Sequence, residues 1–125
     1  MFDWIGVYAG EMKHGPLALV DENIPCIVVA TKDSMHGKML SILQQLKARQ
    51  GRLIVLCTVG DTAIHEVMKG TINSMIIEVP YIIEPLQPII NIVPLQLLSY
   101  HMTVAKNLNV DMPRNLAKAY ANSAY

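Results

Sequence analysis

The sequence has few charged residues and no excess of either sign. Its 125 residues include 10 Lys and Arg against 10 Asp and Glu, so 16% of the chain is charged and the formal net charge is zero. Hydrophobic residues make up 52% of the chain, which excludes a disordered tail because there is enough apolar surface to bury on folding. The balanced charge gives no electrostatic reason to expect a nucleic-acid partner, and the length suits one domain.

Cysteine is scarce as well. Cys26 and Cys57 lie far apart, each within an apolar run, which indicates buried thiols of a cytosolic protein rather than a disulfide. The four histidines are scattered and show no metal-ligand spacing (His14, His36, His65 and His101). We therefore expect neither a metal site nor a cofactor.

A secretory leader and a long hydrophobic run are also missing. Asp3 stands where a signal peptide needs basic residues, and no long apolar core follows it. The longest apolar region, residues 86–98, is broken by prolines, glutamines and an asparagine, so it is a poor membrane span. These features predict a soluble, cytoplasmic protein with no membrane partner.

What the sequence does contain is an alternation of strands and helices. Residues 25–31, 52–58 and 75–79 are apolar runs typical of strands covered on both faces of a parallel sheet. Strand, helix, strand, helix, strand, helix is the order of right-handed crossover units, and it predicts an α/β fold. Three strands are few for such a sheet, so we expect a partial domain whose first strand has an exposed edge.

The helices are expected between these strands. Asp33 or Ser34 caps a predicted amphipathic helix that runs to about Gln50 and is ended by Gly51. Asp61 or Thr62 caps a second, short helix that runs through Met68. A third helix is expected over residues 84–107, with interruptions near Pro88 and Pro94.

The first candidate functional residue is His14. Glu11 and His14 are three residues apart and can share a helical face, and Pro16 predicts a turn near Gly15. A histidine near a helix C-terminus has its charged form favoured and can serve as an acid or base near neutral pH. The alternative is a surface Glu–His pair.

The second candidate is Lys118. Pro113 starts a short helical turn on which Arg114 and Lys118 share a face, and a neighbouring cation lowers the pKa of a lysine. A partly deprotonated lysine is what Schiff-base chemistry at a carbonyl requires. The alternative is a solvated basic tail.

Two strand-to-helix turns are weaker candidates. Residues 30–34 and residues 59–62 each follow a strand and open a helix, a place where phosphate groups can bind. Ordinary turns between a strand and a helix are the favoured alternative at both places.

Several longer blocks resemble the isomerase part of the glutamine–fructose-6-phosphate aminotransferase family. They are residues 9–21 (AGEMKHGPLALVD), residues 92–101 (IVPLQLLSYH) and residues 111–118 (DMPRNLAK), with residues 48–52 (ARQGR) similar to the eukaryotic type. The resemblance implies a sugar isomerase (SIS) domain, a flavodoxin-like sandwich of three layers, αβα. We expect residues 9–118 to form a partial SIS domain between divergent segments, residues 1–8 and 119–125.

The resemblance also implies roles for three residues. His14 falls on the histidine that opens the sugar ring and reaches the site of a neighbouring subunit. Lys118 falls on the lysine that forms a Schiff base with open-chain fructose 6-phosphate. Ala117 falls on a residue whose backbone carbonyl approaches the sugar.

The chain also departs from the family pattern. The helix with the isomerisation glutamate, the Ser/Thr-rich phosphate loop and the glutaminase domain have no counterpart in these residues. We therefore expect a fragment or a truncated gene product that is inactive alone and binds fructose 6-phosphate weakly or not at all. A gene-model artefact that never accumulates is a further interpretation. Its expected partners are a second copy or a full-length synthase, and the alternative is a non-catalytic sugar-phosphate-binding or interaction module.

Overall fold

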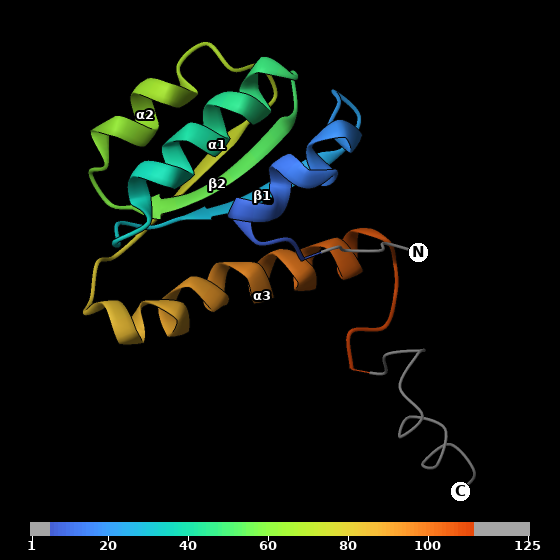
Figure 1. Cartoon of the computed structure of the whole chain (residues 1–125). Helices are drawn as coiled ribbons and strands as arrows, with labels where there is room; N and C mark the ends of the chain where they lie inside the picture. Colours follow the sequence, from blue (N-terminus) through green and yellow to red (C-terminus); the bar gives the residue numbers. More distant parts are fainter. Residues whose placement is uncertain (1–5, 112–125) are drawn as a thin grey trace, which may run out of the picture. The chain divides into compact units, whose positions relative to one another are not determined.

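The computed structural model describes residues 6–111 (Figure 1). These residues divide into two compact units at the boundary between Asn91 and Ile92. Among the described residues, no helix combines the length and hydrophobicity that a membrane crossing requires.

A parallel three-stranded sheet organises the first unit. Strands β1 (Pro25–Ala30), β2 (Arg52–Thr58) and β3 (Met75–Val79) pair in the order β1-β2-β3. Within the described residues β1 is an edge strand, as the sequence predicts. The register places Cys57 beside Glu78, on neighbouring strands. All three predicted strands are confirmed, and β1 ends one residue earlier than expected.

Helices α1 (His36–Ala48) and α2 (Thr62–Met68) cover one face of this sheet (Figure 1). Leu43 of α1 and Ile64 of α2 are fully buried against the central strand β2. The alternate residues of the strands supply the other side of this core, which includes Val28, Ala30, Leu53, Val55 and Cys57.

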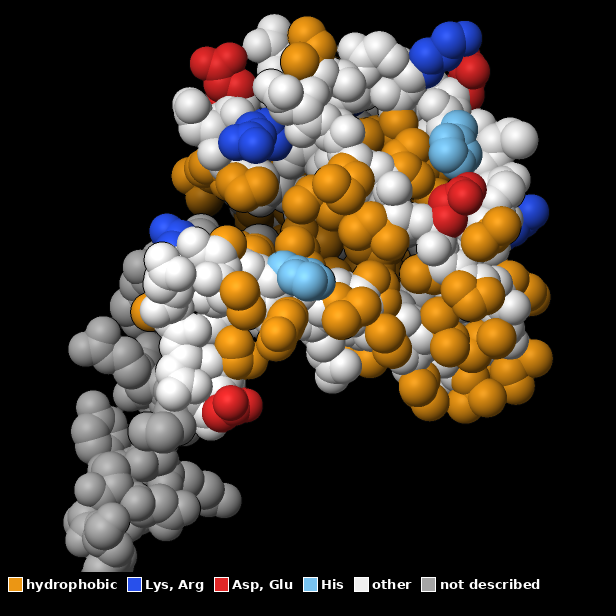
Figure 2. All heavy atoms as spheres, turned by 180° about the vertical axis from the view of Figure 1, so that it is seen from behind, with side chains coloured by type: hydrophobic (Ala, Val, Ile, Leu, Met, Phe, Trp, Pro, Cys, Tyr) orange, Lys and Arg blue, Asp and Glu red, His pale blue; other side chains and the backbone are white. Residues whose placement is uncertain are grey.

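The sheet has a second face, on which α1 and α2 do not pack. Val29 of β1 and Met75 of β3 are exposed, as are large hydrophobic residues that follow β3, namely Tyr81, Ile83, Leu86 and Ile89. Figure 2 shows hydrophobic side chains gathered over much of the surface seen from behind. The first unit therefore carries apolar residues outside the core beneath α1 and α2.

Helix α1 begins later than predicted. Its N-cap is Met35, which makes no side-chain capping bond. The carboxylate of Asp33 instead accepts a hydrogen bond from the Met35 N–H at 2.7 Å, and the Ser34 hydroxyl donates to Glu84 at 3.2 Å. The predicted cap at Asp33 or Ser34 is wrong because both side chains belong to a turn that precedes the helix.

Helix α1 also ends differently from the prediction. Its last residue is Ala48, and the left-handed position after it is Gln50, with φ 60°. Gly51 serves another purpose, since a Cβ atom there would lie 2.8 Å from Val20 Cγ1. Glycine at position 51 thus permits a close approach of the chain to Val20 and does not supply a positive φ.

The start of α2 agrees with the sequence. Asp61 is its N-cap, and the Asp61 carboxylate accepts a hydrogen bond from the Ile64 N–H at 3.2 Å. A carboxylate at this position satisfies a backbone donor that the helix leaves free. Asp61 is therefore confirmed as the cap, and Thr62 is the first helical residue.

The N-terminal segment consists of two short 3₁₀ helices, η1 (Ala9–His14) and η2 (Pro16–Leu19). Gly15 joins them with φ 145° and ψ −58°, a conformation that favours glycine. The predicted turn near Gly15 is therefore confirmed.

The last described helix begins in the first unit and continues into the second. A 3₁₀ turn, η3 (Glu84–Leu86), leads directly into α3 (Gln87–Ala105). The predicted interruptions are wrong. Pro88 falls in the first turn of α3, where no backbone N–H is required, and Pro94 lies within the continuous helix at the loss of one hydrogen bond.

Candidate functional site

His14, the first predicted catalytic residue, is the last residue of η1 and is exposed. Ala9 and Met12 of the same helix pack against the hydrophobic core, so the segment that carries His14 is anchored. Within residues 6–111, no hydrogen bond or ion pair joins His14 to Glu11. Glu11 and His14 are therefore both surface residues that do not bond to each other.

The other predicted site residues belong to the C-terminal segment. Lys118, Ala117 and the neighbouring Arg114 lie outside the described residues. Their roles, and any proximity of Lys118 to His14, remain predictions.

The buried polar residues of the described chain gather at the carboxyl ends of the strands. We call this set the strand-end network, and its members are Thr31, Thr58, Asp61, Gln87 and Asn91. The Thr58 hydroxyl accepts from the backbone N–H of Lys32 at 2.8 Å, which links the ends of β2 and β1. In open α/β sheets, ligands bind outside this edge of the sheet.

Two amides complete the network. Gln87 accepts from the Ile82 N–H at 2.9 Å and donates to the carbonyl of Pro80 and to Asn91, each at 3.1 Å. Asn91 in turn donates to the Thr31 hydroxyl at 3.1 Å. These bonds join the N-terminal part of α3, from Gln87 to Asn91, to residues just after β1 and β3.

Acidic side chains occupy both strand-to-helix turns that were weak phosphate-site candidates. Asp61 caps α2 and contacts Nε2 of His36 at 2.5 Å, while Asp33 accepts the Met35 N–H. Because carboxylates already fill these positions and would repel a phosphate, the geometry favours ordinary turns at both places.

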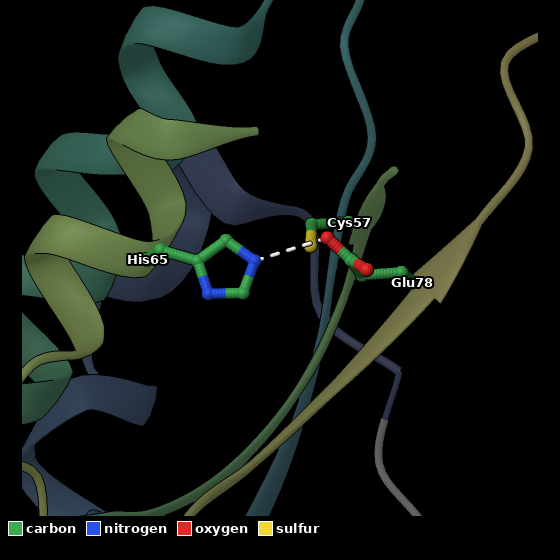
Figure 3. Close-up of side chains that lie close together, drawn as sticks. All are labelled: Cys57, His65 and Glu78. Carbon is green, nitrogen blue, oxygen red and sulfur yellow. Dashed lines mark hydrogen bonds and ion pairs between the residues drawn. The ribbon is translucent and has the colours of Figure 1, made fainter. Parts of the chain in front are cut away.

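A second polar group lies beneath α2, on the covered face of the sheet. Cys57 of β2, His65 of α2 and Glu78 of β3 form what we call the Cys57 cluster (Figure 3). One potential ligand atom from each residue lies within 4.8 Å of the other two. Nε2 of His65 is 3.0 Å from Oε1 of Glu78, and the Gly60 N–H donates to the same oxygen at 3.0 Å.

The environments of these side chains shift their proton affinities in opposite directions. Burial raises the pKa of the Cys57 thiol to about 11, and the charges of Glu78 and Asp61 contribute to the rise. The hydrogen bonds from His65 and from the Gly60 N–H lower the pKa of Glu78. The cluster therefore combines a protonated buried sulfur with an exposed carboxylate that is readily ionised.

The sequence did not reveal this cluster. Its members are 8 and 13 positions apart, which matches no metal-ligand motif. The available signal was the alignment of the strands: once β2 and β3 are paired in parallel, Cys57 and Glu78 become neighbours on one face.

Comparisons with known proteins identify the family to which this fold belongs. A family model described as the SIS domain matches residues 5–106. Glutamine–fructose-6-phosphate aminotransferase (isomerizing) 1 of Arabidopsis thaliana is 58% identical over 114 residues, which are 91% of this chain and 16% of the relative. The corresponding enzyme of Saccharomyces cerevisiae is 48% identical over 114 residues, with the same two coverages.

A solved structure agrees with these relatives. The C-terminal domain of glucosamine-fructose-6-phosphate aminotransferase from Francisella tularensis superposes with a TM-score of 0.70 at 40% identity, covering 82% of this chain and 28% of that one. The chain thus spans about a sixth of the length of the curated relatives described above, and it matches a C-terminal isomerase region. With three parallel strands, the expected α/β architecture and a family model covering most of its length, the chain belongs to the SIS domain family.

Proposed function

We propose that this chain is part of the isomerase domain of a glutamine–fructose-6-phosphate aminotransferase, where it helps to bind fructose 6-phosphate and convert it to glucosamine 6-phosphate. The observation that carries the proposal is the 58% identity over 91% of the chain to a protein named for that activity. The 40% identity to the C-terminal domain of a second such protein supports it independently.

His14 is proposed to open the sugar ring. Its imidazole is exposed on an anchored 3₁₀ helix, as is required of a group that serves the site of a neighbouring subunit. Lys118 is proposed to form the Schiff base with the open-chain ketose, and the Ala117 carbonyl to approach the sugar. Both of these assignments rest on the DMPRNLAK block alone.

The 125 residues by themselves are proposed to be inactive. The isomerisation glutamate and the phosphate loop of the family have no counterpart among them. A single acid–base group contributes roughly 10²–10⁴-fold to a rate, so a site without its proton-transferring glutamate retains little turnover. A cytoplasmic location belongs to the same proposal, and the free thiols of Cys26 and Cys57 support it.

A chimera tests the catalytic assignment. The matching 114 residues of the Arabidopsis enzyme are replaced by those of this chain, and glucosamine 6-phosphate formation is measured. We expect activity, with a loss of about 10²–10⁴-fold in the His14→Ala variant and a near-complete loss in Lys118→Arg, because a guanidinium cannot form the Schiff base. A soluble chimera without activity, or variants as active as their parent, would overturn the proposal. Turnover by the 125-residue chain alone would overturn only its proposed inactivity.

A non-catalytic module that associates with a full-length synthase is the alternative. The edge position of β1 favours it, as do the exposed hydrophobic residues after β3, because both offer surface to a partner. Co-purification of the chain with a full-length relative would support association. Light scattering that shows two independent species would remove it.

A further inference from the structure

We propose that Cys57, His65 and Glu78 form a binding site for a divalent ion of the zinc class. The site is separate from His14, and nothing in the proposed sugar chemistry uses it. In residues 6–111 no other group of three cysteine, histidine or acidic side chains is placed closely enough to hold a metal ion.

The ligand types and distances fit zinc. Zinc binds thiolate sulfur at about 2.3 Å and imidazole nitrogen or carboxylate oxygen at about 2.0–2.2 Å, commonly in a tetrahedron. Those bond lengths place ligand atoms roughly 3.3–3.6 Å apart. The three atoms here lie within 4.8 Å of one another, and Nε2 of His65 is already 3.0 Å from Oε1 of Glu78. Binding an ion requires side-chain rotations that bring the more distant atoms closer and open the His65–Glu78 contact by about 0.3 Å.

The backbone holds the ligands before any ion arrives. Cys57 and Glu78 are register partners on adjacent parallel strands, so their side chains project from the same face of the sheet. Ile64, next to His65, is fully buried and ties α2 to the core. The Gly60 N–H donates to Glu78 Oε1, and such an outer contact fixes the orientation of a ligating carboxylate.

The charges balance when an ion is bound. The Cys57 thiol gives its proton to solvent and coordinates as a thiolate, Glu78 coordinates as a carboxylate, and His65 coordinates through the Nε2 lone pair with its proton on Nδ1. Two anionic ligands neutralise a dication, which removes most of the cost of placing it beside the core. Asp61, whose charge acts on Cys57, adds further negative potential.

The site is accessible from one side. The Cys57 side chain is fully buried, whereas the side chains of His65 and Glu78 are 49% and 39% exposed. An ion can therefore enter past the histidine and carboxylate and reach the sulfur. Three protein ligands leave a fourth position for water, the arrangement of open zinc sites.

Cobalt titration of the purified 125-residue chain tests the proposal. We expect a thiolate-to-cobalt charge-transfer band that saturates at one ion per chain and disappears when Zn²⁺ is added. The ligand variants Cys57→Ala, His65→Asn and Glu78→Gln should each lose more than about 100-fold in affinity, since even outer contacts of metal ligands contribute 10–100-fold. The matched controls Cys26→Ala and His101→Asn should bind as the parent does.

Two outcomes would overturn the site. One is the absence of a charge-transfer band in the folded parent chain, which would leave an ordinary His–Glu ion pair above a core cysteine. The other is unchanged affinity in His65→Asn and Glu78→Gln, two exposed positions whose substitution leaves the core intact even if Cys57→Ala fails to fold. Zn²⁺ should also raise the melting temperature of the parent and of neither variant. None of these measurements depends on sugar turnover.

Discussion

The strand-end network and the Cys57 cluster belong to the same sheet, yet they differ in how their polar atoms are satisfied. In the network, amides and hydroxyls bond to one another and to nearby backbone groups, and the Asp61 carboxylate bonds to His36 and to the Ile64 N–H. In the cluster, His65 and Glu78 are half exposed, and no hydrogen bond reaches the Cys57 sulfur from any described residue. One set is closed and the other is open to a ligand.

This difference separates a structural role from a binding role. Removing any member of a closed buried network lowers the free energy of unfolding, because its partners are left without hydrogen bonds. An open cluster changes the stability little until something binds to it. The following variants test this difference.

The largest effect should come from Asp61→Ala. This change removes the α2 cap and leaves His36 without its partner, and together we expect a loss of about 2–4 kcal/mol in the free energy of unfolding. Urea denaturation measures it. Asp21→Ala is the matched control, since Asp21 caps only an exposed turn. Equal losses in both variants would contradict a structural role for the network.

Asn91→Ala should have the next largest effect. It leaves the Thr31 hydroxyl and one Gln87 bond without a partner, at a cost of about 1–3 kcal/mol. The same denaturation experiment applies, with the exposed Asn23→Ala as control. A midpoint indistinguishable from that of the parent would show that water replaces Asn91 without loss.

Glu78→Gln should lower the stability slightly, and only at pH values at which Glu78 is ionised. Hydrogen bonds lower the pKa of Glu78 from its ordinary 4.5, so the folded state prefers the ionised form. The resulting stabilisation is present above the unfolded pKa and is lost as the pH falls through the folded value. In metal-free buffer, melting curves of parent and variant should therefore converge at low pH. A difference in melting temperature that widens on acidification would mean that the pKa of Glu78 is raised, not lowered, on folding.

Alkylation of Cys57 should be slow because the thiol is buried and almost entirely protonated. With a pKa of about 11, only about one thiol in a thousand is ionised at pH 8, and the side chain is fully buried. Cys26 is partly exposed, and burial raises its pKa as well. Mass spectrometry after iodoacetamide treatment should find Cys26 modified at least tenfold faster. Similar rates at both residues would show that Cys57 is more accessible than the structure indicates.

The strands were predictable because each is a short apolar run bounded by polar residues, and the pattern alone fixes their ends to within one residue. The Asp61 cap was predictable for the same local reason. The start of α1 was not, because Asp33 and Ser34 are equally suited to a cap and to a turn, and only the Ser34–Glu84 contact, 50 positions apart, distinguishes them. The proline interruptions failed because position within a helix decides what a proline costs.

The candidate sites divide in the same way. His14 could be proposed from a contiguous block, and its exposed position on η1 suits the role proposed for it. The Cys57 cluster could not, since strand register and the approach of α2 bring its members together. Lys118 remains a prediction from its block.

Gly15 limits how the His14 segment can change during evolution. No atom lies within 4 Å of the place where a side chain would begin, so neighbouring residues impose no demand for glycine there; the backbone angle alone does. Substitutions of neighbouring residues therefore do not make position 15 tolerant of a side chain, because the constraint lies in the backbone angle. A lineage that no longer needs His14 should lose the histidine first and retain the glycine for as long as η1 and η2 meet at this angle.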